Sequence, residues 1–339
     1  MKKYLTICLV FYLCVIPTYA SEFEAKNYIV MNANNLEVLE GKEIHQTQSV
    51  ASISKIMTAI IAIENCELST EILLNDAISK AYGSAVYIHI GDTITMQDLL
   101  YALLLRSGND AALAISDYVG NGVEGFVDKM KLKAIELGMN NTHFSNPSGL
   151  DEEDDGNISS VYDMALLMSY CISNPIFVEI IGTQTYRRLD KQGSWTNKNK
   201  LLTQYDSSIG GKTGYTKKAK RTLVNAAKKN GITLVCVTFK CGDDFNFHEN
   251  LFETYFNQYS PILLFNKGTH IIDRYRFTLD EELTFPTQID ENINVSYTIQ
   301  PHTISLYANQ TFIGSYSYEY LRSPLIDKIY EVFKRMIYE

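Results

Sequence analysis

The sequence has few positive charges and no long run of them. Its 30 lysine and arginine residues are outnumbered by 39 aspartate and glutamate residues, which gives a formal net charge of -9. A nucleic-acid-binding surface needs clustered lysine and arginine to neutralise phosphates, so nucleic acid is not an expected partner. The P-loop pattern G-x-x-x-x-G-K-[ST] does not occur, so P-loop nucleotide binding has no local support.

Cysteine is scarce as well. Six cysteines occur in 339 residues, and two of them, Cys8 and Cys14, lie in the apolar N-terminal segment. The other four are too few for a disulfide scaffold in a chain of this size. Cys236 and Cys241 flank an apolar strand at an odd spacing, which points them to opposite faces, so we expect no bridge between them. No C-x-x-C or H-E-x-x-H occurs, and no dedicated metal site is indicated.

Residues 1–20 have the pattern of a secretory signal peptide. Lys2 and Lys3 supply the positive charge, residues 5–16 are almost wholly apolar, and small residues end the segment at Ala20. The apolar run is short for a membrane span, and an uncleaved anchor is the alternative interpretation. We therefore expect export to the cell wall or to the outer face of the cytoplasmic membrane.

The hydrophobic pattern of the following residues places a helical block between strands. We expect strands at 27–31 and 36–39, helices at 52–64, 96–105, 110–119, 125–137 and 161–173, strands at 208–215, 221–227 and 232–239, and a helix at 246–259. Strands at both ends of a helical block favour an α/β (α+β) fold, in which helices flank an antiparallel sheet, over a βαβ repeat.

The composition changes after Pro261, and this change suggests domain boundaries. We expect a main domain at 21–262, a β-rich domain at 263–322 with strands at 270–279, 282–285, 293–299 and 304–320, and an amphipathic helix at 323–339. A β module of this size is marginal alone and should dock on the main domain. The apolar face of residues 325–338 fits a packing helix or peripheral contact with a membrane surface, although acidic residues offset the basic ones.

Ser52 and Lys55 form an S-x-x-K pattern at the expected start of a helix. A spacing of three places both side chains on one face, so the amine can reach the hydroxyl. Serine is a weak nucleophile until a base takes its proton. Lys55 can be that base only if burial or a nearby cation depresses its pKa. Alone, the pattern also fits an ordinary helix cap with a solvated lysine.

Two further motifs could complete such a site. Ser107 and Asn109 lie at a break between two expected helices, where a hydroxyl could relay protons and an amide could hold a substrate. Lys212, Thr213 and Gly214 lie on a glycine-rich strand, beside which a peptide could bind by β-augmentation. Each motif in isolation is more often an ordinary loop or turn.

Together, and in this order, the three motifs resemble the set found in penicillin-interacting serine enzymes. The sequence is similar to low-molecular-mass penicillin-binding proteins, specifically to serine-type D-alanyl-D-alanine carboxypeptidases of the bacterial cell wall. The similarity covers roughly residues 28–259 and includes segments 51–58, 107–112, 141–150, 162–165, 197–202 and 210–216. It implies a β-lactamase/transpeptidase-like fold with an all-helical subdomain, and a C-terminal β module that acts as a pedestal.

The resemblance also implies catalytic roles. Ser52 would attack the penultimate D-alanine carbonyl of a peptidoglycan stem peptide, and Lys55 would accept its proton. Ser107 and Lys212 would pass a proton to the leaving amine, and Asn109 would orient the acylated peptide. The route requires no metal or organic cofactor, and β-lactams are expected inhibitors.

The expected substrate-binding residues are Thr213, Gly214, Tyr215 and Lys198. The backbone N–H groups of Tyr215 and of the nucleophile would form the oxyanion hole. The family often carries an arginine before the last helix that helps bind the terminal carboxylate, but segment 242–246 has the acids Asp243 and Asp244 instead. Lys198, Lys212 and Thr213 remain as candidates for binding that carboxylate.

Three alternatives use the same pocket. A class A β-lactamase would need a glutamate that activates water, for which Glu152 and Glu153 are available in an acidic run without the expected flanking pattern. A D,D-endopeptidase would use the same side chains on cross-links. A non-catalytic cell-wall binding protein would have kept the pocket without turnover.

Overall fold

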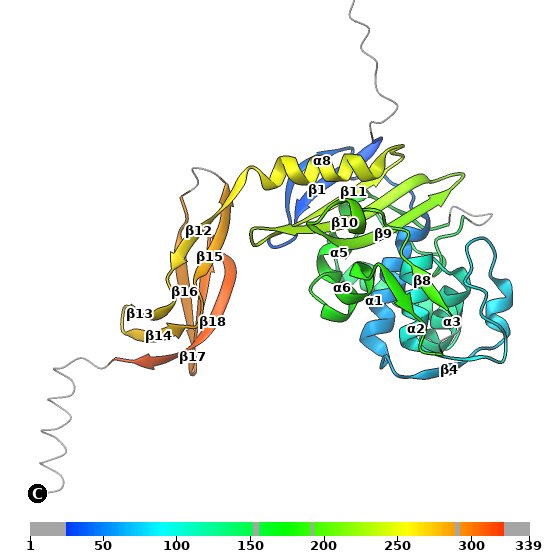
Figure 1. Ribbon diagram of the computed structural model, residues 1–339, viewed down its shortest axis with the longest axis horizontal. Helices are drawn as coiled ribbons and strands as arrows, with labels where there is room; N and C mark the ends of the chain where they lie inside the picture. Colours follow the sequence, from blue (N-terminus) through cyan, green and yellow to red (C-terminus); the bar gives the residue numbers. More distant parts are fainter. Residues whose placement is uncertain (1–24, 152–155, 191–192, 289–291, 322–339) are drawn as a thin grey trace, which may run out of the picture.

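The computed structural model describes residues 25–151, 156–190, 193–288 and 292–321. Its centre is a five-stranded antiparallel sheet in the order β2-β1-β11-β10-β9 (Figure 1). The strands are β1 (Asn27–Asn32), β2 (Glu37–Lys42), β9 (Ser208–Thr216), β10 (Lys220–Lys229) and β11 (Ile232–Phe239). The prediction that strands before and after the helical block form one antiparallel sheet is confirmed.

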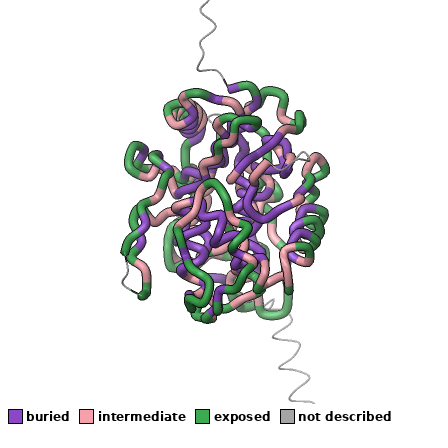
Figure 2. The backbone as a smooth tube through the Cα atoms, turned by 90° about the vertical axis from the view of Figure 1, so that its right-hand side faces the viewer, coloured by how far each residue is buried: buried purple, intermediate pink, exposed green. Residues whose placement is uncertain are grey.

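Helices cover both faces of this sheet, because its strands are apolar on both sides. Along β11, Val235, Val237 and Phe239 enter the larger core, which includes α1 (Lys55–Asn65), α5 (Val161–Cys171) and α6 (Pro175–Gly182). The alternate residues Leu234 and Cys236 pack with α8 (Asp244–Phe256) on the other face. Successive side chains of a strand point to opposite faces, so one strand serves two cores. Figure 2 shows the buried backbone concentrated inside these layers.

The expected helical subdomain lies on the α1 side of the sheet. It contains η1 (Ala51–Ser54), η2 (Asp76–Lys80), α2 (Met96–Tyr101), the π-helical turn η3 (Ala102–Arg106), α3 (Asn109–Gly120) and α4 (Val123–Glu136). Two expectations need correction. Ser52 lies in a 3-10 turn that precedes α1, and the helix expected at 96–105 changes to π geometry at Ala102.

Short elements that the sequence patterns did not predict connect these helices. They are β3 (Gln48–Ser49) with β6 (Ile158–Ser159), β4 (Glu71–Leu73) with β5 (Thr93–Thr95), β7 (Thr185–Arg187) with β8 (Ser194–Thr196), and α7 (Leu201–Gln204). Within the described ranges, no single helix is long and apolar enough to cross a membrane. The pair α5 and α6 reaches that length and hydropathy only together, across a bend of 109°.

The C-terminal residues form a separate β module, which Figure 1 shows at the opposite end from α2 and α3. β12 (Tyr259–Phe265) pairs with β15 (Leu283–Gln288). A second sheet has the order β13 (Gly268–Ile272), β14 (Tyr275–Leu279), β18 (Thr311–Tyr320), β17 (Thr303–Ala308) and β16 (Val295–Gln300). Phe277, Leu279, Ile304 and Leu306 form its small buried core.

Three boundaries in this region differ from expectation. The helix expected at 246–259 ends at Phe256, because β12 already begins at Tyr259. The strands expected at 270–279 and 304–320 are each a hairpin, since Asp273 and Asn309 adopt positive φ angles and turn the chain. The expected signal peptide, the terminal helix and Glu152 with Glu153 lie outside the described residues.

Candidate active site

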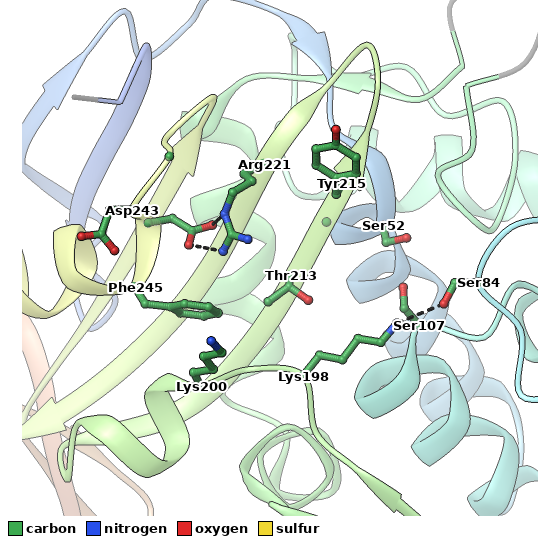
Figure 3. A pocket seen from close by; sticks show the side chains of 13 residues that line it. Ser52, Ser84, Ser107, Lys198, Lys200, Thr213, Tyr215, Arg221, Asp243 and Phe245 are labelled. Carbon is green, nitrogen blue, oxygen red and sulfur yellow. Dashed lines mark hydrogen bonds and ion pairs between the residues drawn. The ribbon is translucent and has the colours of Figure 1, made fainter. Parts of the chain in front are cut away.

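The three sequence motifs meet in one cleft of about 470 Å³ at the edge of the central sheet (Figure 3). Ser52 comes from η1, Ser107 from the turn between η3 and α3, and Thr213, Gly214 and Tyr215 from β9. β9 is the terminal strand of the sheet, so its outer edge is open to a peptide. Residues more than 100 positions apart are therefore brought together by the sheet edge and the helical subdomain.

Lys55 is the most enclosed side chain of the site. It is fully buried, and its Nζ atom lies 3.1 Å from Ser52 Oγ and 2.7 Å from Asn109 Oδ1, and it also contacts the carbonyl of Ser148. A neutral amine has two protons, which the amide and carbonyl oxygens accept, and one lone pair. That lone pair is left for the proton of the Ser52 hydroxyl. The geometry is that of a serine with an adjacent base.

The pKa values of the two buried lysines support this arrangement. Burial holds the pKa of Lys55 well below its ordinary value, and the charges of Lys212 and Lys198 lower it further, while Asp110 opposes them. Burial, together with Lys198, lowers the pKa of Lys212 to about 7. Burial thus favours the uncharged form of Lys55, which a general base requires.

The turn that carries Ser52 depends on a close contact with Gly149. Ala51 adopts φ +54°, and Gly149, at φ +77°, lies against it. A Cβ atom on Gly149 would be 2.0 Å from the Ala51 carbonyl oxygen, a distance no side chain can occupy. The loop 146–149 therefore fixes Ser52 from one side and supplies the Ser148 carbonyl to Lys55 from the other.

Ser107 and Asn109 have different surroundings. Ser107 ends the π turn in the left-handed region at φ 64°, and its buried Oγ has no hydrogen-bond partner among the described residues. That hydroxyl is available to a reacting group. Asn109 donates its Nδ2 to the Tyr82 carbonyl at 2.6 Å, while its Oδ1 accepts from Lys55. Both ends of this amide are engaged, so its direct contacts here fix Lys55.

The residues of β9 divide into buried and open positions. Lys212 is buried, and its Nζ donates to the Thr213 carbonyl at 2.7 Å. A Cβ atom on Gly214 would lie 3.1 Å from the Ser52 nitrogen, so glycine at this position lets the strand approach η1. Tyr215 is 64% exposed beside them. This approach brings the backbone N–H of Ser52 close to β9.

Cations and acids border the rest of the cleft. Lys198 lies across from Thr213, and its Nζ donates to Ser84 Oγ at 3.1 Å (Figure 3). Arg221 of β10 pairs with Tyr215 in the sheet register and donates from Nε to Asp244 Oδ2 at 3.1 Å and from Nη2 to the other oxygen. Its guanidinium carbon lies 5.4 Å from the centre of the Phe245 ring.

Sequence reasoning missed Arg221 and Ser84. The acidic residues 243–244 suggest the loss of a cation from this region, but buried Asp244 instead holds an arginine of the neighbouring strand in the cleft. A hairpin register of β9 and β10 would have placed Arg221 beside Tyr215. Ser84 comes from a loop whose sequence carries no comparable signal.

Comparisons with known proteins agree with this geometry. A family model described as D-alanyl-D-alanine carboxypeptidase matches residues 15–242. D-alanyl-D-alanine carboxypeptidase DacF of Bacillus subtilis is 34% identical over 224 residues, an alignment that covers 64% of this chain and 57% of that protein. The chain therefore matches little more than half the length of that relative.

Two solved structures resemble the main domain. The crystal structure of D-alanyl-D-alanine carboxypeptidase from Mycobacterium tuberculosis has a TM-score of 0.65 at 30% identity, covering 69% of this chain and 91% of that one. A mutant of a Streptomyces DD-transpeptidase has a TM-score of 0.62 at 30% identity, covering 69% of this chain and 96% of that one.

Proposed function

Because the chain belongs to the D-alanyl-D-alanine carboxypeptidase family of serine peptidases, we propose that it removes the terminal D-alanine from peptidoglycan stem peptides through an acyl-enzyme on Ser52. The contact between the buried Lys55 amine and Ser52 Oγ, at 3.1 Å, carries this proposal. It joins a nucleophile to a base whose pKa is depressed, beside a sheet edge that can bind a peptide.

In the acylation step, Ser52 Oγ forms a bond to the carbonyl carbon of the penultimate D-alanine, and its proton moves to Lys55. The carbon–nitrogen bond then breaks, and the proton held by Lys55 passes through Ser107 and Lys212 to the leaving D-alanine amine, which returns Lys55 to its neutral form. The unpartnered hydroxyl of Ser107 is suited to this relay. The backbone N–H groups of Ser52 and Tyr215 stabilise the developing oxyanion, at roughly 3 kcal/mol for each donor.

The carboxylate of the leaving residue needs a cation on the β9 side of the cleft. Thr213, with Lys212 and Lys198, is one part of this subsite. Arg221 adds a guanidinium that Asp244 and Phe245 hold in place through its Nε and Nη2 edge. Among the described residues Nη1 has no hydrogen-bond partner and can donate to a substrate oxygen, so Arg221 would act beside these residues as the carboxylate-binding arginine that segment 242–246 lacks.

Hydrolysis of the ester by water returns the enzyme to its starting state, and Lys55 can activate that water as it activated Ser52. No step of this route uses a metal or an organic cofactor. β-Lactams acylate Ser52 in the same way, since their strained amide presents an equivalent carbonyl to the nucleophile.

A substrate in peptidoglycan requires an extracytoplasmic enzyme. We therefore propose that residues 1–20 direct export, that 21–262 form the catalytic domain, and that 263–322 form a pedestal. Residues 323–339 would then bring the chain to the outer face of the membrane, with 325–338 as the lipid contact. Release of the protein from cells by removal of 323–339 would support that contact.

Mass spectrometry of the intact protein tests the function directly. Incubation with a pentapeptide that ends in D-Ala-D-Ala should release one D-alanine, and incubation with penicillin should give a long-lived adduct. Ser52→Ala should abolish both. An adduct on Ser52→Ala would refute the nucleophile, rapid turnover of penicillin would favour a β-lactamase, and labelling without D-alanine release would favour a binding protein.

A further inference from the structure

A second cavity, larger than the catalytic cleft, runs along one face of α3. Its volume is about 700 Å³, against about 470 Å³ for the cleft. Asn109, Leu113 and Asp117 line it, as does Asn121, which caps the end of the helix. A spacing of four residues places these side chains in one row. We call this cavity the α3 groove.

The dimensions of the α3 groove fit an extended peptide. Residues from segments 76–82, 121–125 and 145–150 line it together with α3. α3 has 12 residues, so the row spans about 18 Å at about 1.5 Å per residue. An extended peptide of about five residues has the same length, at about 3.3 Å per residue.

The groove is separate from the cleft but touches the groups that hold the catalytic lysine. Among the described residues, none lines both cavities. Asn109 and Ser148 line the groove, and both accept hydrogen bonds from Lys55 Nζ. A ligand in the groove would therefore contact two of the three groups around Lys55 without reaching Ser52.

The charges of the lining favour a cationic ligand. Asp76, Asp117 and Glu124 contribute three carboxylates, and Lys80 contributes one ammonium group. Tyr82, which is 54% exposed, also lines the groove and offers an aromatic face, to which an ammonium group is attracted. Serine and asparagine side chains in the same lining can bond to a peptide backbone.

We propose that the α3 groove binds a short, extended peptide that carries a free ammonium group, while the cleft holds the peptide that is cut. The choice of peptide rests on the proposed function. Stem peptides of peptidoglycan contain a diamino acid, and its side-chain amine meets the charge requirement. The groove would thus hold an uncut stem peptide of the same polymer and keep the enzyme on a substrate rich in such peptides.

The test uses the full chain with its cleft blocked by penicillin on Ser52. The probe is the tripeptide Nα-acetyl-L-Ala-γ-D-Glu-L-Lys, and the control probe carries a second acetyl group on the lysine side chain. Calorimetry should give a Kd of about 0.1 mM for the first and binding at least about tenfold weaker for the second, because acetylation removes the charge.

Matched variants locate the binding. Leu113→Trp should fill the groove and abolish binding, while Asp117→Asn and Glu124→Gln should each weaken it about fivefold, the scale of one exposed ion pair. Asp128→Asn removes a carboxylate from the same helix as Glu124, outside the groove, and should leave the Kd unchanged. Retention of the penicillin adduct by each variant confirms that it is folded.

Different failures have different meanings. Equal binding of both probes, loss of tripeptide binding after acylation of Ser52, or unchanged binding to Leu113→Trp would each overturn the groove assignment while leaving the proposed function intact. Absence of a penicillin adduct on the wild type would contradict the proposed function alone. The variants would then test the groove on the unlabelled chain.

Discussion

The substitution Asn109→Asp tests the electrostatics of the site most directly. It replaces the amide oxygen that lies 2.7 Å from Lys55 Nζ with a carboxylate oxygen of nearly the same shape. At that distance and an effective dielectric constant of ~20, a unit charge favours the protonated amine by about 6 kcal/mol. This exceeds the worth of an ordinary hydrogen bond several-fold, so charge rather than contact decides the outcome.

The expected result is a loss of the base at neutral pH. The carboxylate raises the pKa of Lys55, so the amine stays charged and cannot accept the Ser52 proton. Acylation by a fluorescent penicillin, followed from pH 6 to pH 10, should fall roughly 10³-fold at pH 7. Its rate should rise with pH up to the alkaline end of the range, because only the deprotonated amine reacts.

Asn109→Leu is the matched control. It removes both hydrogen bonds of the Asn109 side chain and introduces no charge, so acylation should fall without an alkaline displacement of the pH profile. Circular dichroism and thermal unfolding would show that both variants fold. An Asn109→Asp enzyme that acylates within tenfold of the wild-type rate at pH 7, with an unshifted profile, would refute the assignment of Lys55 as the base.

Three other predictions follow from individual contacts. Arg221→Gln should lower kcat/KM about 10²-fold for a peptide with a terminal carboxylate and leave kcat/KM for the corresponding carboxamide unchanged. Equal losses for both peptides would show that Arg221 has a structural role alone. Lys212→Met should abolish D-alanine release yet stabilise the fold in urea by about 3 kcal/mol at pH 7. Burial lowers the pKa of Lys212 from 10.5 to about 7, so the wild type loses stability as the pH falls through that window. A variant less stable than the wild type at pH 7 would contradict this. Burial also lowers the pKa of His248 from 6.5 to about 3. As the pH falls, His248 therefore binds a proton in the unfolded chain before it does so in the folded chain. The free energy of unfolding should fall by up to about 1.4 kcal/mol per pH unit between those two pKa values. His248→Gln should flatten that dependence in acid unfolding curves, and an unchanged slope would exclude the histidine as its source.

Some boundaries could not be predicted, because competing tertiary contacts decided them. The hydrophobic pattern of 246–259 continues a helix, yet β12 starts at Tyr259 because its backbone pairs with β15 far along the chain. The π turn at η3 also has no signal in the sequence. It ends at Ser107, which adopts a left-handed conformation at φ 64°.

The three motifs could be recognised from residue type and order alone. The subsite for the substrate carboxylate could not be recognised in this way. Acidic residues at 243–244 removed the expected cation from one segment. Only the pairing of β9 with β10 shows that Arg221 reaches the same cleft and that Asp244 anchors it there. Local sequence patterns could not predict that contact, because 23 positions separate Arg221 from Asp244.

The sequence by itself determined the alternation that builds a two-faced antiparallel sheet, and the serine and lysine spacing that lets one side chain reach the other. These are local properties, set by backbone geometry over a few residues. Only the tertiary structure decided that Lys55 is buried between Asn109 and the Ser148 carbonyl, where burial lowers its pKa. Desolvation depends on everything that surrounds a group, and those surroundings come from segments 50 to 160 residues away.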